Sequence, residues 1–130
     1  MIQSSVSILD SGALEILNVD ENNDGSIDDD VLRSALEHIN NGYDYMLVHF
    51  HEIDDMGHSY GPFGEKTLDR IRITDGFVRE LTEAFSGRII LTADHGMHVT
   101  ASGGSHGRGG FEDFVVPYIV FQGQYGEKDR

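Results

Sequence analysis

Residues 45–62 have the sequence YMLVHFHEIDDMGHSYGP, and this stretch decides the interpretation of the whole chain. The first part, 45–51, is apolar on both alternating faces, which is typical of an interior strand of a parallel sheet. The part that follows, up to about Gly64, predicts a loop leaving the carboxyl end of that strand. Ligands bind beyond the carboxyl ends of the strands in such sheets, so this loop is a candidate for a functional site.

The segments around this stretch predict alternating strands and helices. Further strand candidates are 14–19, 88–92 and 114–121, and Pro117 indicates an edge or a bulge in the last of them. Apolar spacing predicts helices at 31–39 and about 65–85, the second with an apolar stripe. That stripe consists of Leu68, Ile71, Val78, Leu81 and Phe85. Since strands and helices alternate, we expect an α/β fold with a mostly parallel sheet flanked by helices.

The composition excludes several classes of function. The chain has 130 residues, enough for one domain, and its 23 acidic and 9 basic residues give a net charge of −14. A field of that sign repels nucleic-acid polymers and anionic membranes. The longest apolar runs are strand-sized and the start is unlike a signal peptide, so we expect no membrane segment and slightly favour the cytoplasm. Without cysteine, any metal must be bound by histidine nitrogen and carboxylate oxygen.

Residues 20–28, DENNDGSID, resemble a calcium-binding EF-hand loop through its ninth position. The twelfth position, which should carry the closing carboxylate, is Val31. We therefore prefer a turn that leads to a helix N-cap at Asp28, with Asp29 and Asp30 favoured by the helix dipole. A calcium-binding module built on 20–28 remains the alternative from a different functional class.

Two loops carry the residues that point to metal chemistry. His51-Glu52 suggests an HExxH zinc motif, but the next histidine is His58, seven residues on, so the motif fails. Better ligand candidates are Asp54 and His58 in the first loop, and Asp94, His95 and His106 in the glycine-rich loop 93–113. Both loops leave carboxyl ends of predicted strands, so their side chains are expected to converge. We assign scaffold roles to His49 and His51, a supporting or exposed role to Asp55, and an exposed position to His98.

The order Asp54-x-x-Gly57-His58-x-x-Gly61-Pro62, Asp94-His95-Gly96 and Gly104-Ser105-His106-Gly107 resembles the metal-binding half of the alkaline phosphatase superfamily. Its Gly-His-Ser-Tyr-Gly-Pro form is most similar to the type I phosphodiesterase/nucleotide pyrophosphatase branch. The resemblance covers roughly residues 31–123. It implies a partial alkaline-phosphatase-like core in which Asp54, His58 and His106 bind one divalent ion, and Asp94 and His95 bind a second. The ligand set suits zinc, with manganese as the rival.

Members of this superfamily carry a further aspartate and a Thr or Ser nucleophile on an N-terminal half, and nothing in this chain matches either. We therefore expect residues 1–130 to be a single partial domain from the C-terminal portion of a larger phosphodiesterase or pyrophosphatase, inactive alone, with 1–12 and 122–130 frayed. The resemblance implies a phosphate-ester or nucleotide-type substrate and a missing N-terminal half as partner. A phosphomutase or a phosphoethanolamine transferase shares these ligands. An uncovered sheet edge also predicts self-association.

Overall fold

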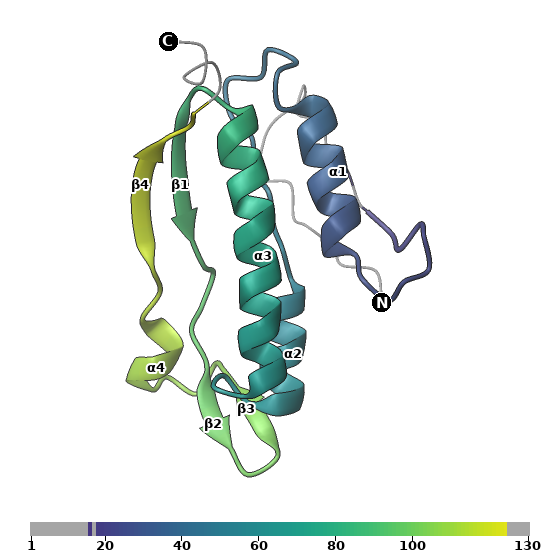
Figure 1. Ribbon diagram of the computed structural model, residues 1–130. Coiled ribbons are helices and arrows are strands. Elements are labelled where there is room, and N and C mark those ends of the chain that lie inside the picture. The colour runs from purple at the N-terminus through teal and green to yellow at the C-terminus, as the bar shows by residue number, and fades with distance from the viewer. Residues whose placement is uncertain (1–15, 17, 125–130) are drawn as a thin grey trace.

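The computed structural model describes residue 16 and residues 18–124 (Figure 1). Four helices and four strands follow one another in the order α1, α2, α3, β1, β2, β3, α4, β4. Their bounds are Asp28–His38 for α1, Glu52–Tyr60 for α2, Glu65–Ala84 for α3, Arg88–Thr92 for β1, His98–Thr100 for β2, Gly103–Ser105 for β3, Phe111–Phe114 for α4 and Tyr118–Gln122 for β4. The predicted helices and the strand at 88–92 are present, and the fold is α/β.

The strands form two small antiparallel sheets. β1 pairs with β4, with Ile90 opposite Val120, and β2 pairs with β3 as a hairpin. The mostly parallel sheet expected from the sequence is not seen among the described residues. The predicted strand at 114–121 is shifted, because α4 occupies Phe111–Phe114 and β4 begins at Tyr118, directly after Pro117. Of the predicted strand at 14–19, residues 14, 15 and 17 lie outside the described part.

Residues 45–50, predicted to be an interior strand, are extended but belong to no assigned strand. Within the described part of the chain, their backbone forms no hydrogen bond with another backbone group. Side chains along the segment alternate between half-buried and exposed, and Leu47 is 76% exposed. The expectation of burial on both faces is therefore wrong for this chain.

The predicted loop after His51 is also wrong, because Glu52–Tyr60 form helix α2. The first residue of α1 and the first residue of α2 are both acids, and each side chain accepts hydrogen bonds at the N-terminus of the other helix. Asp28 accepts hydrogen bonds from the backbone N–H groups of His51 at 2.9 Å and Glu52 at 3.2 Å. In return, Glu52 accepts from the backbone N–H of Ile27 at 2.7 Å and that of Asp28 at 3.2 Å. Asp28 is thus the first residue of α1 and caps α2, and the prediction that it caps its own helix is corrected.

A residue of α3 compensates the negative charge of Glu52. The Arg70 guanidinium on α3 lies 2.6 Å from the second carboxylate oxygen of Glu52, and both side chains are largely buried. Ser26 donates a further hydrogen bond to Glu52 at 2.6 Å. Burial raises the pKa of Asp28, while its hydrogen bonds from the backbone of His51 and Glu52 act in the opposite direction. One buried polar network therefore holds α1, α2 and α3 together.

The hydrophobic core is small. Among the described residues, Leu32 and Ala35 of α1 are the only buried hydrophobic side chains. The buried residues of α3 are Thr67, Thr74 and Thr82, whereas Leu68 and Ile71 of its predicted apolar stripe are exposed. The stripe exists as a pattern, but it does not pack into a core of this chain.

In the loop 20–28, the oxygen side chains bond to the backbone of the loop itself. Asp20 accepts from the N–H groups of Asp24 and Gly25, and Asp24 accepts from that of Ser26. Buried Asp30 pairs with Arg33 and accepts from the N–H of Glu21 at 3.0 Å. In the described part of the chain, the groups of histidine and carboxylate side chains with a spacing suited to a metal ion both contain Asp54, and neither lies in this loop.

The exchange of carboxylates can be tested by replacing Glu52 with alanine. The free energy of unfolding should fall by about 3 kcal/mol, because the change leaves Arg70 and the first N–H groups of α1 without their carboxylate. Urea unfolding monitored by circular dichroism measures the effect. The matched control is Glu65→Ala, which removes an exposed acid from the first turn of α3 and should cost less than about 1 kcal/mol. Equal losses for the two variants would contradict the assigned role of Glu52.

Candidate metal centre

Asp54 and His58 lie one turn apart on α2, so their side chains share one face of the helix. The distance between the Asp54 Oδ2 and His58 Nε2 atoms is 3.4 Å. Gly57, between these two residues, is buried in the helix. A Cβ there would lie 2.6 Å from the Met97 sulfur, so this glycine makes room for the segment that carries His95. Convergence of Asp54 and His58 follows from helical spacing.

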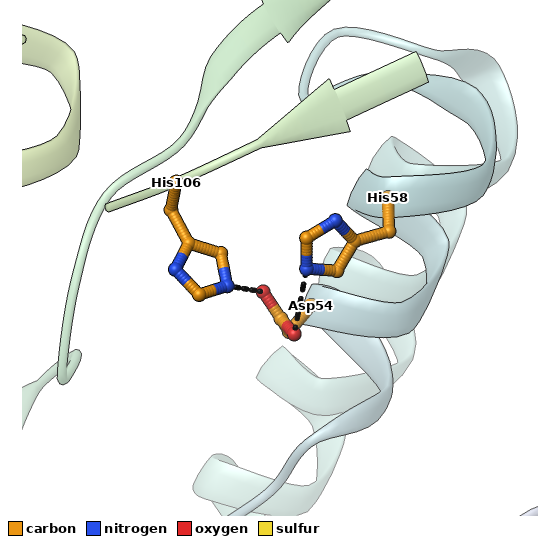
Figure 2. Close-up of side chains that lie close together, drawn as sticks. All are labelled: Asp54, His58 and His106. Carbon is orange, nitrogen blue, oxygen red and sulfur yellow. Dashed lines mark ion pairs between the residues drawn. The ribbon is translucent and has the colours of Figure 1, made fainter. Parts of the chain in front are cut away.

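His106 reaches the same place from the β2–β3 hairpin. It directly follows β3, which packs against α2 so closely that a Cβ on Gly103 would lie 2.1 Å from the His58 carbonyl oxygen. The Gly103 φ angle of 147° is also one that side-chain-bearing residues rarely adopt. As a result, the His106 Nε2 atom lies 3.7 Å from the Asp54 Oδ1 atom, and the carboxylate of Asp54 lies between the two imidazole rings (Figure 2).

These separations match the spacing of ligands around a metal ion. A tetrahedral ion with bonds of about 2.0–2.1 Å holds its ligand atoms about 3.4 Å apart. Distances of 3.4 and 3.7 Å from Asp54 to His58 and His106 are close to this value and too long for ordinary hydrogen bonds. Ligand atoms of the three side chains all lie within 4.8 Å of one another.

Backbone carbonyls fix the protonation of two of the imidazoles. The Nδ1 atom of His58 is 3.0 Å from the Gly104 carbonyl oxygen, and that of His95 is 3.0 Å from the Gly96 carbonyl oxygen. A carbonyl can only accept, so each Nδ1 carries a proton and donates it. In a neutral ring, Nε2 then keeps a lone pair. Both rings are therefore in the tautomer in which Nε2 can ligate a metal.

The carboxylate of Asp54 lacks a partner that would explain its position. Its Oδ1 atom is buried and accepts no hydrogen bond in the described part of the chain. A buried carboxylate oxygen left in this way costs free energy, and a cation between it and the histidine nitrogens removes that cost. Asp54, His58 and His106 consequently fit one divalent ion with N/O preference.

Asp94 and His95 lie beside this cluster. The His95 ring stacks on His106 with centroids 3.7 Å apart. Its Nε2 atom is 3.9 Å from Asp54 Oδ1 and 3.7 Å from Asp94 Oδ2. Asp94 extends outward, with 65% of its side chain exposed. All five ligands proposed from the sequence are thus brought to one place, with Asp94 on the outer side.

Two further histidines line this region. His51 Nε2 lies 3.9 Å from Asp54 Oδ2 and 3.6 Å from Asp55 Oδ1, and these three residues form a second group with metal-ligand spacing. His49 Nε2 lies 4.0 Å from Asp94 Oδ2. The sequence pattern predicts scaffold roles for both histidines, whereas the structure places their imidazole nitrogens within 4.0 Å of the carboxylates.

Asp113 is a buried acid that the sequence analysis missed. One of its carboxylate oxygens lies 2.7 Å from His98 Nδ1, and the other accepts the Arg108 backbone N–H at 2.9 Å. Its carbonyl accepts the Gly96 N–H at 2.9 Å. His98 is therefore not an exposed loop residue, because its side chain is only 19% exposed. Asp113 fixes the backbone next to His95 and close to His106. The signal for it was an acid at the end of the glycine-rich loop 93–113.

A family model matches residues 7–108, and its description is type I phosphodiesterase / nucleotide pyrophosphatase. The match includes all five proposed ligands and most of the chain. The chain belongs to this family. It is accordingly a member of the alkaline phosphatase superfamily, as its motifs predict. No solved structure matches the chain.

Curated relatives match a shorter part of the chain. GPI ethanolamine phosphate transferase 1 of Neurospora crassa is 38% identical over 82 residues, and its Aspergillus oryzae counterpart is 35% identical over 82. GPI ethanolamine phosphate transferase 3 of Eremothecium gossypii is 30% identical over 90 residues. The matched segments are 58%, 58% and 63% of this chain, and they span 8%, 8% and 9% of those relatives.

None of the helices that the structure describes combines the length and the apolar character needed to cross a bilayer. The relatives give no support to the slight preference for the cytoplasm drawn from the sequence.

The pair formed by His98 and Asp113 predicts a pH-dependent contribution to stability. The hydrogen bond from His98 lowers the pKa of Asp113 below its ordinary value, with burial acting against it. A carboxyl with a lowered native pKa stabilises the fold above its ordinary pKa and loses this contribution as the pH falls through the lowered one.

Asp113→Asn should therefore destabilise the protein at neutral pH, and the difference from wild type should shrink between about pH 5 and pH 2. Urea unfolding at several pH values measures it. Glu112→Gln changes the exposed neighbour and provides the control. A difference that is constant with pH would contradict the assigned pairing.

Proposed function

We propose that this chain forms the cation-binding portion of a larger enzyme that cleaves or transfers phosphate esters. The observation that carries the proposal is the environment of Asp54. Its carboxylate lies among the Nε2 atoms of His51, His58, His95 and His106 at distances of 3.4–3.9 Å, and one of its oxygens has no hydrogen bond in the described part. Four imidazoles around one carboxylate whose side chain is only 21% exposed suit a cation better than a hydrogen-bonded network.

In this proposal, Asp54, His58 and His106 bind a first divalent ion, and Asp94 and His95 contribute to a second. Zinc suits the nitrogen-rich set, and manganese is the rival. Two such ions together stabilise the charge on the attacking and leaving oxygens of a phosphoryl group. The residues of the chain hold the ions in place, because the carbonyls of Gly104 and Gly96 fix the rings of His58 and His95. The bound cations also offset the net charge of −14, which by itself repels a phosphate ester.

The nucleophile and the remaining ligands of the second ion are proposed to come from polypeptide outside these residues. We assign no catalytic nucleophile to this chain, in keeping with the expected Thr or Ser on an N-terminal half. The matched segments are only 8–9% of the relatives, so a larger protein leaves ample room for both.

The group that accepts the phosphoryl moiety separates two candidate reactions. Water would make the enzyme a phosphodiesterase or pyrophosphatase, as the sequence motifs first indicate. An alcohol would make it a transferase, and the names of the relatives, GPI ethanolamine phosphate transferases, favour this second reaction. Both reactions act on a small-molecule phosphate ester and use the same ligands. The phosphomutase alternative has no such support, and the loop 20–28 of the calcium-binding alternative contains no group of three carboxylates with ligand spacing.

The ligand assignment predicts the metal content of the purified chain. Zinc affinity should fall by more than about 100-fold in Asp54→Ala and in His106→Ala, since the loss of a supporting residue alone costs 10–100-fold. Elemental analysis and calorimetric titration with zinc, manganese and calcium measure this. His38→Ala is the control, because His38 lies on α1 and bonds to the Ser34 carbonyl. Unchanged zinc binding in both ligand variants would refute the assignment.

The absence of a nucleophile predicts that the 130-residue chain, loaded with zinc, hydrolyses bis(p-nitrophenyl) phosphate no faster than free zinc does. Release of p-nitrophenol is the measurement. Turnover by the chain that disappears in His58→Ala would contradict the expected inactivity of these 130 residues. Turnover that His58→Ala leaves unchanged would identify a trace contaminant.

A further inference from the structure

A second cluster of metal-ligating side chains lies beside the proposed metal centre and consists of His51, Asp54 and Asp55. The His51 Nε2 atom is 3.9 Å from Asp54 Oδ2 and 3.6 Å from Asp55 Oδ1. One ligand atom from each side chain lies within 4.8 Å of the other two. We call this group the His51 cluster. The proposed function assigns a ligand role to Asp54 alone among its members.

One turn of structured backbone builds the His51 cluster. His51 is the N-cap of α2, and Asp54 and Asp55 follow it by three and four residues, so the three side chains lie on one face. The backbone N–H groups of Asp54 and Asp55 donate to the His51 carbonyl at 2.9 and 3.4 Å. The His51 N–H in turn donates to buried Asp28 at 2.9 Å. The spacing of the cluster therefore follows from a capped helix and not from a loose loop.

The side chains of the His51 cluster meet without hydrogen bonds. Within the described residues, none of the three side chains donates or accepts one. A protonated His51 would be expected to place its Nε2–H within about 2.9 Å of one carboxylate, and the observed separations are longer. They are closer to the spacing of about 3.0–3.4 Å between neighbouring ligands of one ion. Asp55 is 60% exposed, so its side chain can rotate to close the difference.

Asp54 has one oxygen for each of two ions. Its Oδ1 atom is the buried one and lies 3.7 Å from His106 Nε2, on the side of the first ion. Its Oδ2 atom lies 3.9 Å from His51 Nε2. A carboxylate has lone pairs on both oxygens, so Asp54 can bridge an ion held with His106 and an ion held with His51.

The donor set of the His51 cluster differs from that of the first ion. It combines one imidazole with two carboxylates at a partly exposed place, where water can complete the coordination. Magnesium and manganese prefer carboxylate and water ligands, whereas zinc suits the two imidazoles of His58 and His106. The N-terminus of α2 carries a partial positive charge of about half a unit, which two ionised carboxylates outweigh.

We propose that the His51 cluster is a further cation site, which takes magnesium or manganese and is bridged through Asp54 to the first ion of the metal centre. This inference rests on the proposed function in one respect, because that function assigns Asp54 to the first ion. A cation on Oδ2 draws negative charge away from the first ion. Its binding is therefore expected to weaken zinc at the first position by about threefold or more, and zinc weakens it by the same factor.

The test titrates manganese into the 130-residue chain loaded with one equivalent of zinc. Electron paramagnetic resonance of free manganese measures the binding, and zinc content is measured in the same samples. His51→Ala and Asp55→Asn should each weaken manganese by about tenfold or more, while zinc stays bound. Asp69→Asn is the matched control for charge, because Asp69 is an equally exposed acid that pairs with Arg72 on α3. It should leave manganese binding unchanged.

A second measurement tests the shared carboxylate. One equivalent of cobalt replaces zinc, and its visible absorption reports the ligands of the first ion. Addition of magnesium, which has no visible absorption, should change the cobalt spectrum of the wild-type chain. The same addition should leave the spectrum of His51→Ala unchanged, because the bridging ion can no longer bind.

Several results would overturn the inference. Equal manganese affinity in wild type, His51→Ala and Asp55→Asn would refute the site. Loss of manganese in His95→Ala but not in His51→Ala would assign the ion to Asp94 and His95 instead. An equal loss in Asp69→Asn would reduce the binding to surface charge. A constant cobalt spectrum with manganese binding intact would refute the bridge through Asp54. Failure of the wild-type chain to bind zinc, with manganese still lost in His51→Ala, would refute the proposed function and not the His51 cluster.

Discussion

The exchange of carboxylates between Asp28 and Glu52 is the constraint on which the rest of the structure depends. Each acid satisfies the first N–H groups of the other helix, and Arg70 of α3 compensates the charge. A helix of nine residues that contains a glycine is marginal alone, so α2 needs this cap to begin at Glu52. The starting residue of α2 in turn fixes which face carries Asp54 and His58. The candidate metal centre is thus positioned by a polar network, since the apolar core in the described part of the chain is too small to do so.

The second half of the centre depends on close backbone approach. The β2–β3 hairpin packs against α2 only because Gly103 has no side chain, and this contact places the Gly104 carbonyl where it orients the His58 ring. Asp113 holds the other end of the hairpin loop through the Arg108 and Gly96 N–H groups. The ring of His106 is therefore constrained from both sides. Such constraints lower the entropy cost of assembling four imidazoles and a carboxylate around one point.

Sequence patterns predict α3 and β1 well. The apolar residues of α3 recur with the 3.6-residue period of a helix, and β1 is a short apolar run of strand length. They failed for α2, whose sequence EIDDMGHSY contains residues of low helix propensity and is stabilised by Asp28 from outside the helix. The antiparallel pairing of β4 with β1 could not be predicted either, since an apolar run does not show in which direction a strand lies relative to its neighbour. The five candidate ligands, which the structure brings together, could be selected from residue chemistry and order. Asp113 was missed because its role depends on contacts that spacing does not reveal.

The expectation of a buried apolar stripe on α3 illustrates what a sequence pattern encodes. Ile71, Val78, Leu81 and Phe85 have the spacing of a helix face that packs on a sheet, yet in this chain they line a groove. The pattern is selected for the whole folded domain, so it reports contacts whether or not their partners lie within the same 130 residues. The apolar character of 45–51 has the same origin, because it is typical of a strand with neighbours on both edges. The two surfaces for which predicted burial fails are therefore those that the larger domain proposed above would cover, and both lead to the edge that holds Asp54 and His95.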